Sequence, residues 1–269
     1  MLVMLAPSFD GSNDAYARLV KATGMLAYDL KSRLKPGIWG VVRSLGDQEQ
    51  AQELLGRLLA ERLPALIVPR EVAHDPNRRI VTIRGLELGS DQLKVHLRER
   101  EMSIPFGALS CIVRGEVHTG HVPSRAVSPS SATFRAVAPT SDVQMFRESV
   151  SVSNFEVYSA ADLHFATVLW VARLDARSFD FSALGLANDS PAADLDQLVD
   201  LLSQRSGVRV DRGVRTSSVV STLTQGGASR SSGTVQAVRA KDSSDERFDP
   251  YSRVIGEAER LLAQARKVA

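Results

Sequence analysis

Residues 38–68 read IWGVVRSLGDQEQAQELLGRLLAERLPALIV and predict a strand, a helix and a second strand, in that order. Ile38–Val42 is short, apolar and rich in β-branched side chains, which is typical of a strand. Asp47 is suited to cap a helix over Gln48–Leu63, because its carboxylate accepts hydrogen bonds from the free N–H groups of the first turn. The helix has one apolar face, formed by Ala51, Leu54, Leu55, Leu58 and Leu59. Leu66–Val68 is the second strand.

The residues before this stretch add one strand and two helices. Leu2–Leu5 is a short apolar run and predicts the first strand. Apolar side chains then recur at helical spacing, at Tyr16, Leu19, Val20, Met25 and Leu26. Gly24 interrupts this pattern, so we expect one helix to end there and a second to begin, and we expect Pro36 to stop the second. The first unit therefore follows the order β-α-α-β-α-β.

After Arg79 the apolar period changes to two. Alternation over residues 80–84 and 93–98 predicts strands of an antiparallel meander with one buried face. The nearly continuous apolar run Phe165–Leu174 predicts a central strand, and the pair Ser190-Pro191 predicts the start of a helix. We therefore expect an α+β fold, in which the small unit continues into the meander and a second, strand-rich unit with one main helix and a flexible tail follows.

Changes in composition divide the chain into five parts. We expect the N-terminal α/β unit and its meander over residues 1–118, and a linker over 119–145 that is rich in Ser, Pro, Thr and Ala. A C-terminal α+β unit is expected over 146–223. Gly, Ser and charged residues then predict a flexible linker over 224–248, before a C-terminal amphipathic helix over 249–269.

Composition narrows the class of protein. Apolar residues make up 43% and charged residues 24%, as in ordinary globular proteins, and the apolar runs are too short to cross a bilayer. The N-terminus lacks the basic region of a signal peptide, and Cys111 is the single cysteine, so we expect a cytoplasmic protein without disulfides. The net charge of +2, with both signs interleaved, and the 6% aromatic content argue against nucleic acid as a partner.

Residues 16–70 resemble the C-terminal domain of the bacterial ribosomal stalk protein, which shares its fold with the Clp protease adaptor. The resemblance is carried by ATGMLAYDLK over Ala22–Lys31, by QEQAQELL over Gln48–Leu55, and by the order of elements. Trp39 and Pro69 depart from the family pattern. The lysine-rich factor-binding helix of the family is reduced here to Lys21, Lys31, Arg33 and Lys35. The resemblance implies a protein-docking module that performs no chemistry.

Glu116, His118 and His121 are the candidate metal ligands. On a strand, Glu116 and His118 face the same side, and His121 follows a glycine that would let the chain fold back. Two imidazoles and one carboxylate suit zinc or iron, and three protein ligands are enough for a catalytic zinc site. The alternative is a polar strand end that enters a linker. No other cofactor is expected, and no residue is assigned as catalytic or cofactor-binding.

The final helix is the candidate partner-binding element. Arg253 and Arg260 flank the apolar side chains of Val254, Leu261 and Leu262. A basic amphipathic helix of this kind binds acidic surfaces or the groove of another helix. The alternative is a helix that covers a sheet of the same chain.

These features favour a non-enzymatic protein-protein interaction or adaptor protein of the bacterial cytoplasm type. The expected partner is another protein or a second copy of the chain, without a membrane. One alternative is a metal-dependent hydrolase that uses Glu116, His118 and His121. The other is a small-molecule sensor with a pocket between the two units.

Overall fold

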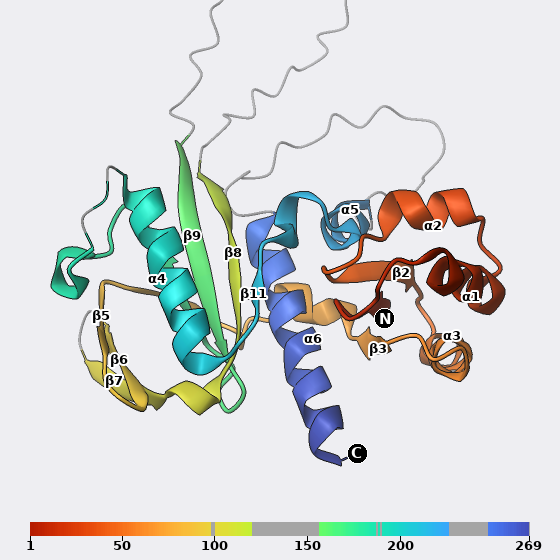
Figure 1. Cartoon of the computed structure of the whole chain (residues 1–269), viewed down its shortest axis with the longest axis horizontal. Helices are drawn as coiled ribbons and strands as arrows, with labels where there is room; N and C mark the ends of the chain where they lie inside the picture. The colour runs from red at the N-terminus through yellow and green to blue at the C-terminus, as the bar shows by residue number, and fades with distance from the viewer. Residues whose placement is uncertain (98–99, 120–155, 187, 189, 226–246, 269) are drawn as a thin grey trace, which may run out of the picture.

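A computed structural model describes residues 1–97, 100–119, 156–186, 188, 190–225 and 247–268 (Figure 1). The fold is α+β, as the sequence predicts. Helix α6 (Phe248–Val268) runs through the middle of the molecule, between a three-stranded sheet on one side and a five-stranded sheet on the other (Figure 1). None of the helices in the described part of the chain combines the length and the apolarity that crossing a membrane requires.

The N-terminal unit has the predicted order β-α-α-β-α-β. Its elements are β1 (Leu2–Leu5), α1 (Asn13–Thr23), α2 (Ala27–Arg33), β2 (Gly40–Ser44), α3 (Gln48–Ala60) and β3 (Ala65–Val68). The sheet order is β2-β1-β3, with both neighbours antiparallel to β1. Asp47 caps α3 by accepting the N–H of Glu49 at 2.9 Å. Gly24 ends α1 in the left-handed region at φ 67°, where a residue without Cβ is favoured.

Both faces of this small sheet are buried. Val3 and Leu5 point into a core formed with helices α1 to α3. Leu2 and Met4, which alternate with them along β1, point the other way into a core shared with α6. Trp39 belongs to that second core and is fully buried.

The five-stranded sheet has the order β11-β8-β9-β10-β4. Its strands are β4 (Ile80–Ile83), β8 (Leu109–Thr119), β9 (Glu156–Phe165), β10 (Val171–Asp175) and β11 (Val210–Asp211). Strands β8 and β9 pair antiparallel along nearly their full length, from Leu109 opposite Phe165 to Thr119 opposite Glu156. The predicted division into two units after residue 118 is therefore corrected, because the strands on either side of the predicted linker belong to one sheet.

A second correction concerns the run Phe165–Leu174, which the sequence predicts as one central strand. The structure ends β9 at Phe165 and begins β10 at Val171, so a turn connects the two strands. Val168 and Leu169 lie in this turn and are 36% and 50% exposed. Apolar side chains in a tight connection between two strands give the same local pattern as a continuous strand.

The predicted meander is confirmed only in part, because residues 80–84 do not belong to it: β4 pairs parallel with β10 in the five-stranded sheet. The predicted strand over residues 93–98 corresponds to β6 (Gln92–His96) and lies in a separate antiparallel sheet. The strands of this meander are β5 (Gly85–Leu88), β6 and β7 (Glu101–Pro105). The meander and α4 (Pro191–Ser206) share one apolar core with the face of the five-stranded sheet that points away from α6. The remaining elements are α5 (Ser218–Gln225) and the short 3-10 turns Arg70–His74, Phe106–Ala108, Ser182–Leu184 and Gly213–Arg215.

Gly256 allows α6 to approach β9 closely. A Cβ atom at this position would overlap the imidazole ring of His164. We expect Gly256→Ala to lower the free energy of unfolding by about 1–3 kcal/mol through overpacking, measured by chemical denaturation. Gly56, inside α3, is the matched control, because a Cβ there meets open space. Gly56→Ala should raise stability by about 0.5–1 kcal/mol, since alanine favours the helix. A Gly256→Ala variant as stable as the parent protein would contradict this packing.

Candidate functional site

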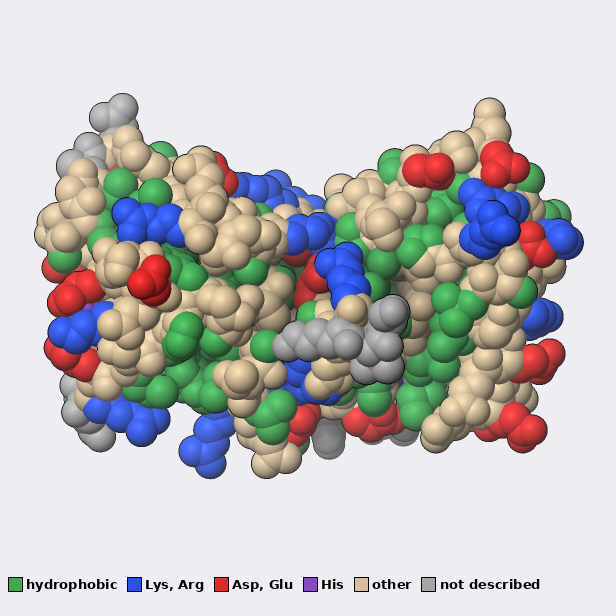
Figure 2. All heavy atoms as spheres, turned by 60° about the horizontal axis from the view of Figure 1, so that its bottom comes forward, with side chains coloured by type: hydrophobic (Ala, Val, Ile, Leu, Met, Phe, Trp, Pro, Cys, Tyr) green, Lys and Arg blue, Asp and Glu red, His purple; other side chains and the backbone are tan. Residues whose placement is uncertain are grey.

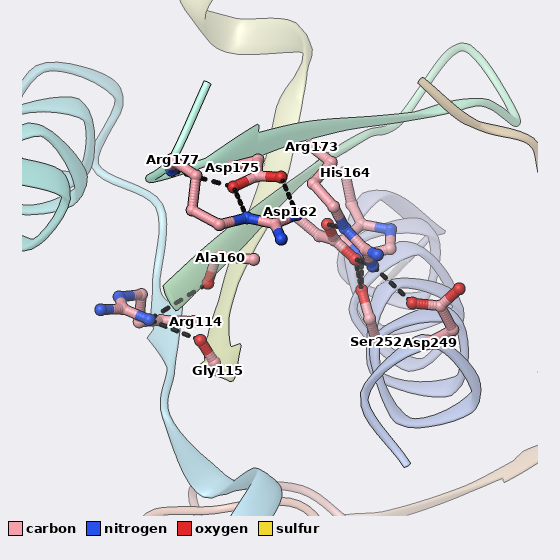
Figure 3. A network of polar contacts seen from close by, with 10 residues as sticks. All are labelled: Arg114, Gly115, Ala160, Asp162, His164, Arg173, Asp175, Arg177, Asp249 and Ser252. Carbon is pink, nitrogen blue, oxygen red and sulfur yellow. Dashed lines mark hydrogen bonds and ion pairs between the residues drawn. The ribbon is translucent and has the colours of Figure 1, made fainter. Parts of the chain in front are cut away.

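A network of buried polar side chains lies where β9 and β10 meet α6 (Figure 3). Arg173 on β10 makes a two-pronged ion pair with Asp162 on β9, with distances of 2.7 Å from Nε to Oδ1 and 2.8 Å from Nη2 to Oδ2. Nη2 also donates to Asp249 Oδ1 at 2.7 Å, at the start of α6. Asp162 and Arg173 are almost entirely buried. The pair therefore holds the first turn of α6 against the sheet.

Ser252 on α6 joins this network to His164. Its Oγ lies 2.6 Å from Asp162 Oδ2 and 2.8 Å from His164 Nε2. Burial lowers the pKa of His164 to about 4, so the imidazole is neutral at pH 7. Burial also acts to raise the pKa of Asp162, but the charge and hydrogen bonds of Arg173 bring it below its ordinary value, so Asp162 is a carboxylate.

These charge states fix the direction of both hydrogen bonds. A carboxylate only accepts, so the Ser252 hydroxyl donates to Asp162. Its oxygen then accepts from the Nε2–H of His164. His164 is therefore a donor to Ser252, and not the base that a nucleophilic serine requires. The contacts of Asp162, His164 and Ser252 suit an anchor between α6 and β9.

The predicted metal ligands Glu116 and His118 are both on β8 and line one pocket. This pocket, of about 530 Å³, is bounded by Glu116, His118, Val214, Arg215, Ser217, Val220, Ser221 and Arg247. Arg215 forms an ion pair with the Glu116 carboxylate. His121 lies outside the described residues. Within the described ranges, no three His, Cys, Asp or Glu side chains are grouped so that they could hold a metal ion. The metal site stays a prediction.

The C-terminal helix corresponds to α6, and its predicted partner-binding residues contact the chain itself. Val254 is fully buried, while Leu261 and Leu262 are partly buried against the core. Arg253 Nη1 donates to the carbonyl of Ala73 at 3.3 Å, and Arg260 forms an ion pair with Glu257. The helix covers a sheet of the same chain, which is the alternative given above, and Val254 has no surface left for a partner. The apolar stripe of α6 also includes Phe248, Tyr251, Ile255 and Ala258, which are all buried.

Cys111 is not activated as a nucleophile. It is buried in the core that α6 shares with β8, and burial raises the pKa of its thiol well above the ordinary value. It therefore acts as a small apolar side chain.

A second pocket, of about 380 Å³, lies beside β2, the edge strand of the three-stranded sheet. We call it the arginine pocket; it is lined by Met25, Arg33, Val42, Arg43, Ser44, Arg70 and Thr222. Arg33 and Arg43 are exposed, and Arg70 is half-buried and donates to the carbonyl of Leu223 at 3.3 Å. In the part of the chain that the structure describes, none of these three arginines forms an ion pair with a carboxylate.

Sequence reasoning did not find the arginine pocket. Its cations come from the end of α2, from β2 and from the turn after β3, and no local pattern connects them. Two of the largest exposed apolar side chains are nearby in sequence, since Leu26 and Tyr28 are 72% and 82% exposed where α2 begins. On the face drawn in Figure 2, by contrast, Lys and Arg are interspersed with Asp and Glu. That face shows no continuous basic track for a nucleic acid.

No protein-family model matches this chain, and neither a curated protein nor a solved structure shows significant similarity to it.

Proposed function

We propose that this chain is a non-enzymatic protein-interaction protein, of the adaptor kind, which docks a partner at the arginine pocket. The observation that carries the proposal is the set of three arginines, Arg33, Arg43 and Arg70, around one pocket without a carboxylate partner among the described residues. Cations that share a pocket repel one another, and a negatively charged ligand relieves this repulsion.

Two further features support a docking role. The resemblance of residues 16–70 to protein-docking modules is a prediction from the sequence that favours this role. The potentially reactive side chains Asp162, His164 and Ser252 are buried and hydrogen-bonded to one another, as structural groups are. A cytoplasmic location, where Cys111 stays reduced, is part of the proposal.

A small-molecule sensor is the second candidate function. The pocket of about 530 Å³ at Glu116 and His118 favours it, because β8 forms one wall and residues 214–221 form another.

The docking role can be tested by selecting peptides from a random display library on the immobilised full chain. We expect at least one group of selected peptides to lose about tenfold or more in affinity on Arg43→Ala, because a charge-assisted contact is removed. Arg57→Ala is the matched control, since Arg57 is also exposed and lies in the last turn of α3, outside the pocket. Failure to select any peptide, or equal binding to the Arg43→Ala and parent proteins, would refute docking at this pocket.

A further inference from the structure

We infer that the ligand of the arginine pocket is an acidic peptide segment, which presents at least two carboxylates together with an apolar side chain. The inference rests on the proposed function and specifies the chemistry of the partner.

The three cations of the pocket are supplied by separate elements. Arg33 is the last residue of α2, Arg43 lies within β2, and Arg70 begins the turn that follows β3. The contact of Arg70 with the Leu223 carbonyl holds its guanidinium in place before a ligand arrives. A planar guanidinium pairs with a carboxylate through two parallel hydrogen bonds, so the pocket can engage several carboxylates in defined positions.

The pocket also has an apolar part. Met25, which is partly exposed, lines it together with the arginines, while Val42 is only 2% exposed and belongs to the core. Leu26, the next residue along the chain, is 72% exposed. An apolar side chain between two acidic residues of a peptide would cover the exposed part of Met25 and remove it from water. A volume of about 380 Å³ accepts a few side chains, and not a folded domain.

The surroundings favour a peptide over a nucleic acid. The net charge of the chain is only +2, and Asp29 lies on α2, the helix that supplies Arg33. A phosphate backbone needs a continuous basic path, and it gains nothing from Met25. Among the described residues that line the pocket there is no aromatic side chain, on which a base could stack.

The test uses a fluorescent octapeptide of alternating glutamate and valine, with its glutamine-valine isostere as the neutral control. Binding to the full chain is followed by fluorescence anisotropy. We expect the acidic peptide to bind, and the neutral one to bind about tenfold more weakly or worse. Arg33→Ala and Arg43→Ala should each lower the affinity for the acidic peptide about tenfold, while Arg57→Ala should leave this affinity unchanged. Because the contacts are ionic, raising the salt concentration should weaken binding as well.

The outcomes separate this inference from the proposed function. If the acidic peptide fails to bind but display-selected peptides without acidic residues still depend on Arg43, docking stands and the acidic chemistry is wrong. If no peptide of either kind binds at the pocket, both are wrong. The inference is also wrong if a duplex oligonucleotide or inorganic phosphate displaces the acidic peptide when the competitor and the peptide are present at the same total negative charge. The inference is also wrong if sedimentation shows that the parent chain self-associates and that the sole effect of Arg43→Ala is to make it a monomer, because the pocket would then bind a second copy of the chain.

Discussion

Replacing Arg173 with alanine should lower the free energy of unfolding by about 3–5 kcal/mol, which is a large share of the stability of an ordinary domain. The side chain is 5% exposed and pairs with both Asp162 and Asp249. Its removal leaves the Asp162 carboxylate buried without a counter-charge, and it releases the first turn of α6. Urea denaturation followed by circular dichroism measures the loss.

Arg212→Ala is the control for this prediction. Arg212 also pairs with two aspartates, Asp196 and Asp200, but all three side chains are about half exposed. Exposed ion pairs contribute about 0–1 kcal/mol, so the free energy of unfolding of this variant should be close to that of the parent protein. An Arg173→Ala variant that matched Arg212→Ala would show that the buried pair is not needed to hold α6.

Acidification should destabilise the protein through His164. Its pKa is about 4 in the folded chain, against about 6.5 for an unfolded histidine. Between these two values the unfolded chain binds more protons than the folded chain, so falling pH favours unfolding. The contribution of the neutral imidazole is fully present above about pH 6.5, and about 3 kcal/mol is lost as the pH falls to 4.

His164→Gln isolates this effect, because the glutamine amide keeps a donor near Ser252 but does not titrate. We expect the parent protein to lose about 3 kcal/mol more than the variant between pH 7 and 4, in denaturant titrations at each pH. The carboxylates titrate in both proteins and cancel in the comparison. Parallel stability curves for the two proteins would mean that the pKa of His164 is the same in the folded and the unfolded chain.

Local patterns were sufficient to predict the N-terminal unit and strand β6 of the meander, but they assigned residues 80–84 to the wrong sheet. The caps at Asp47 and Gly24, and the change of period after Arg79, act over a few residues and are visible in the sequence. The pairing of β8 with β9 joins Thr119 to Glu156, and no local signal specifies the partner of a strand across such a separation. For this reason the division after residue 118 was wrong, while the type of fold was predicted correctly.

The candidate sites follow the same rule. Glu116 and His118 are two residues apart, so their common face on a strand was predictable, and both line one pocket. The contact between Asp162 and Ser252 joins two elements far apart in the chain, so spacing could not predict it. The alternation of Asp162 and His164 with Ala161 and Leu163 along β9 was the available signal, since it places both polar side chains on one face.

The central position of α6 has a consequence for how the chain folds during its synthesis. The ribosome makes α6 after every strand that the helix covers, so Val113 and Ala160 have no cover on that side until residues 248–258 have been translated. The core of Val3, Leu5 and helices α1 to α3 involves only early residues, and it can close sooner. Nascent chains therefore carry a half-finished apolar sheet for much of their elongation, the stage at which chaperones engage such surfaces.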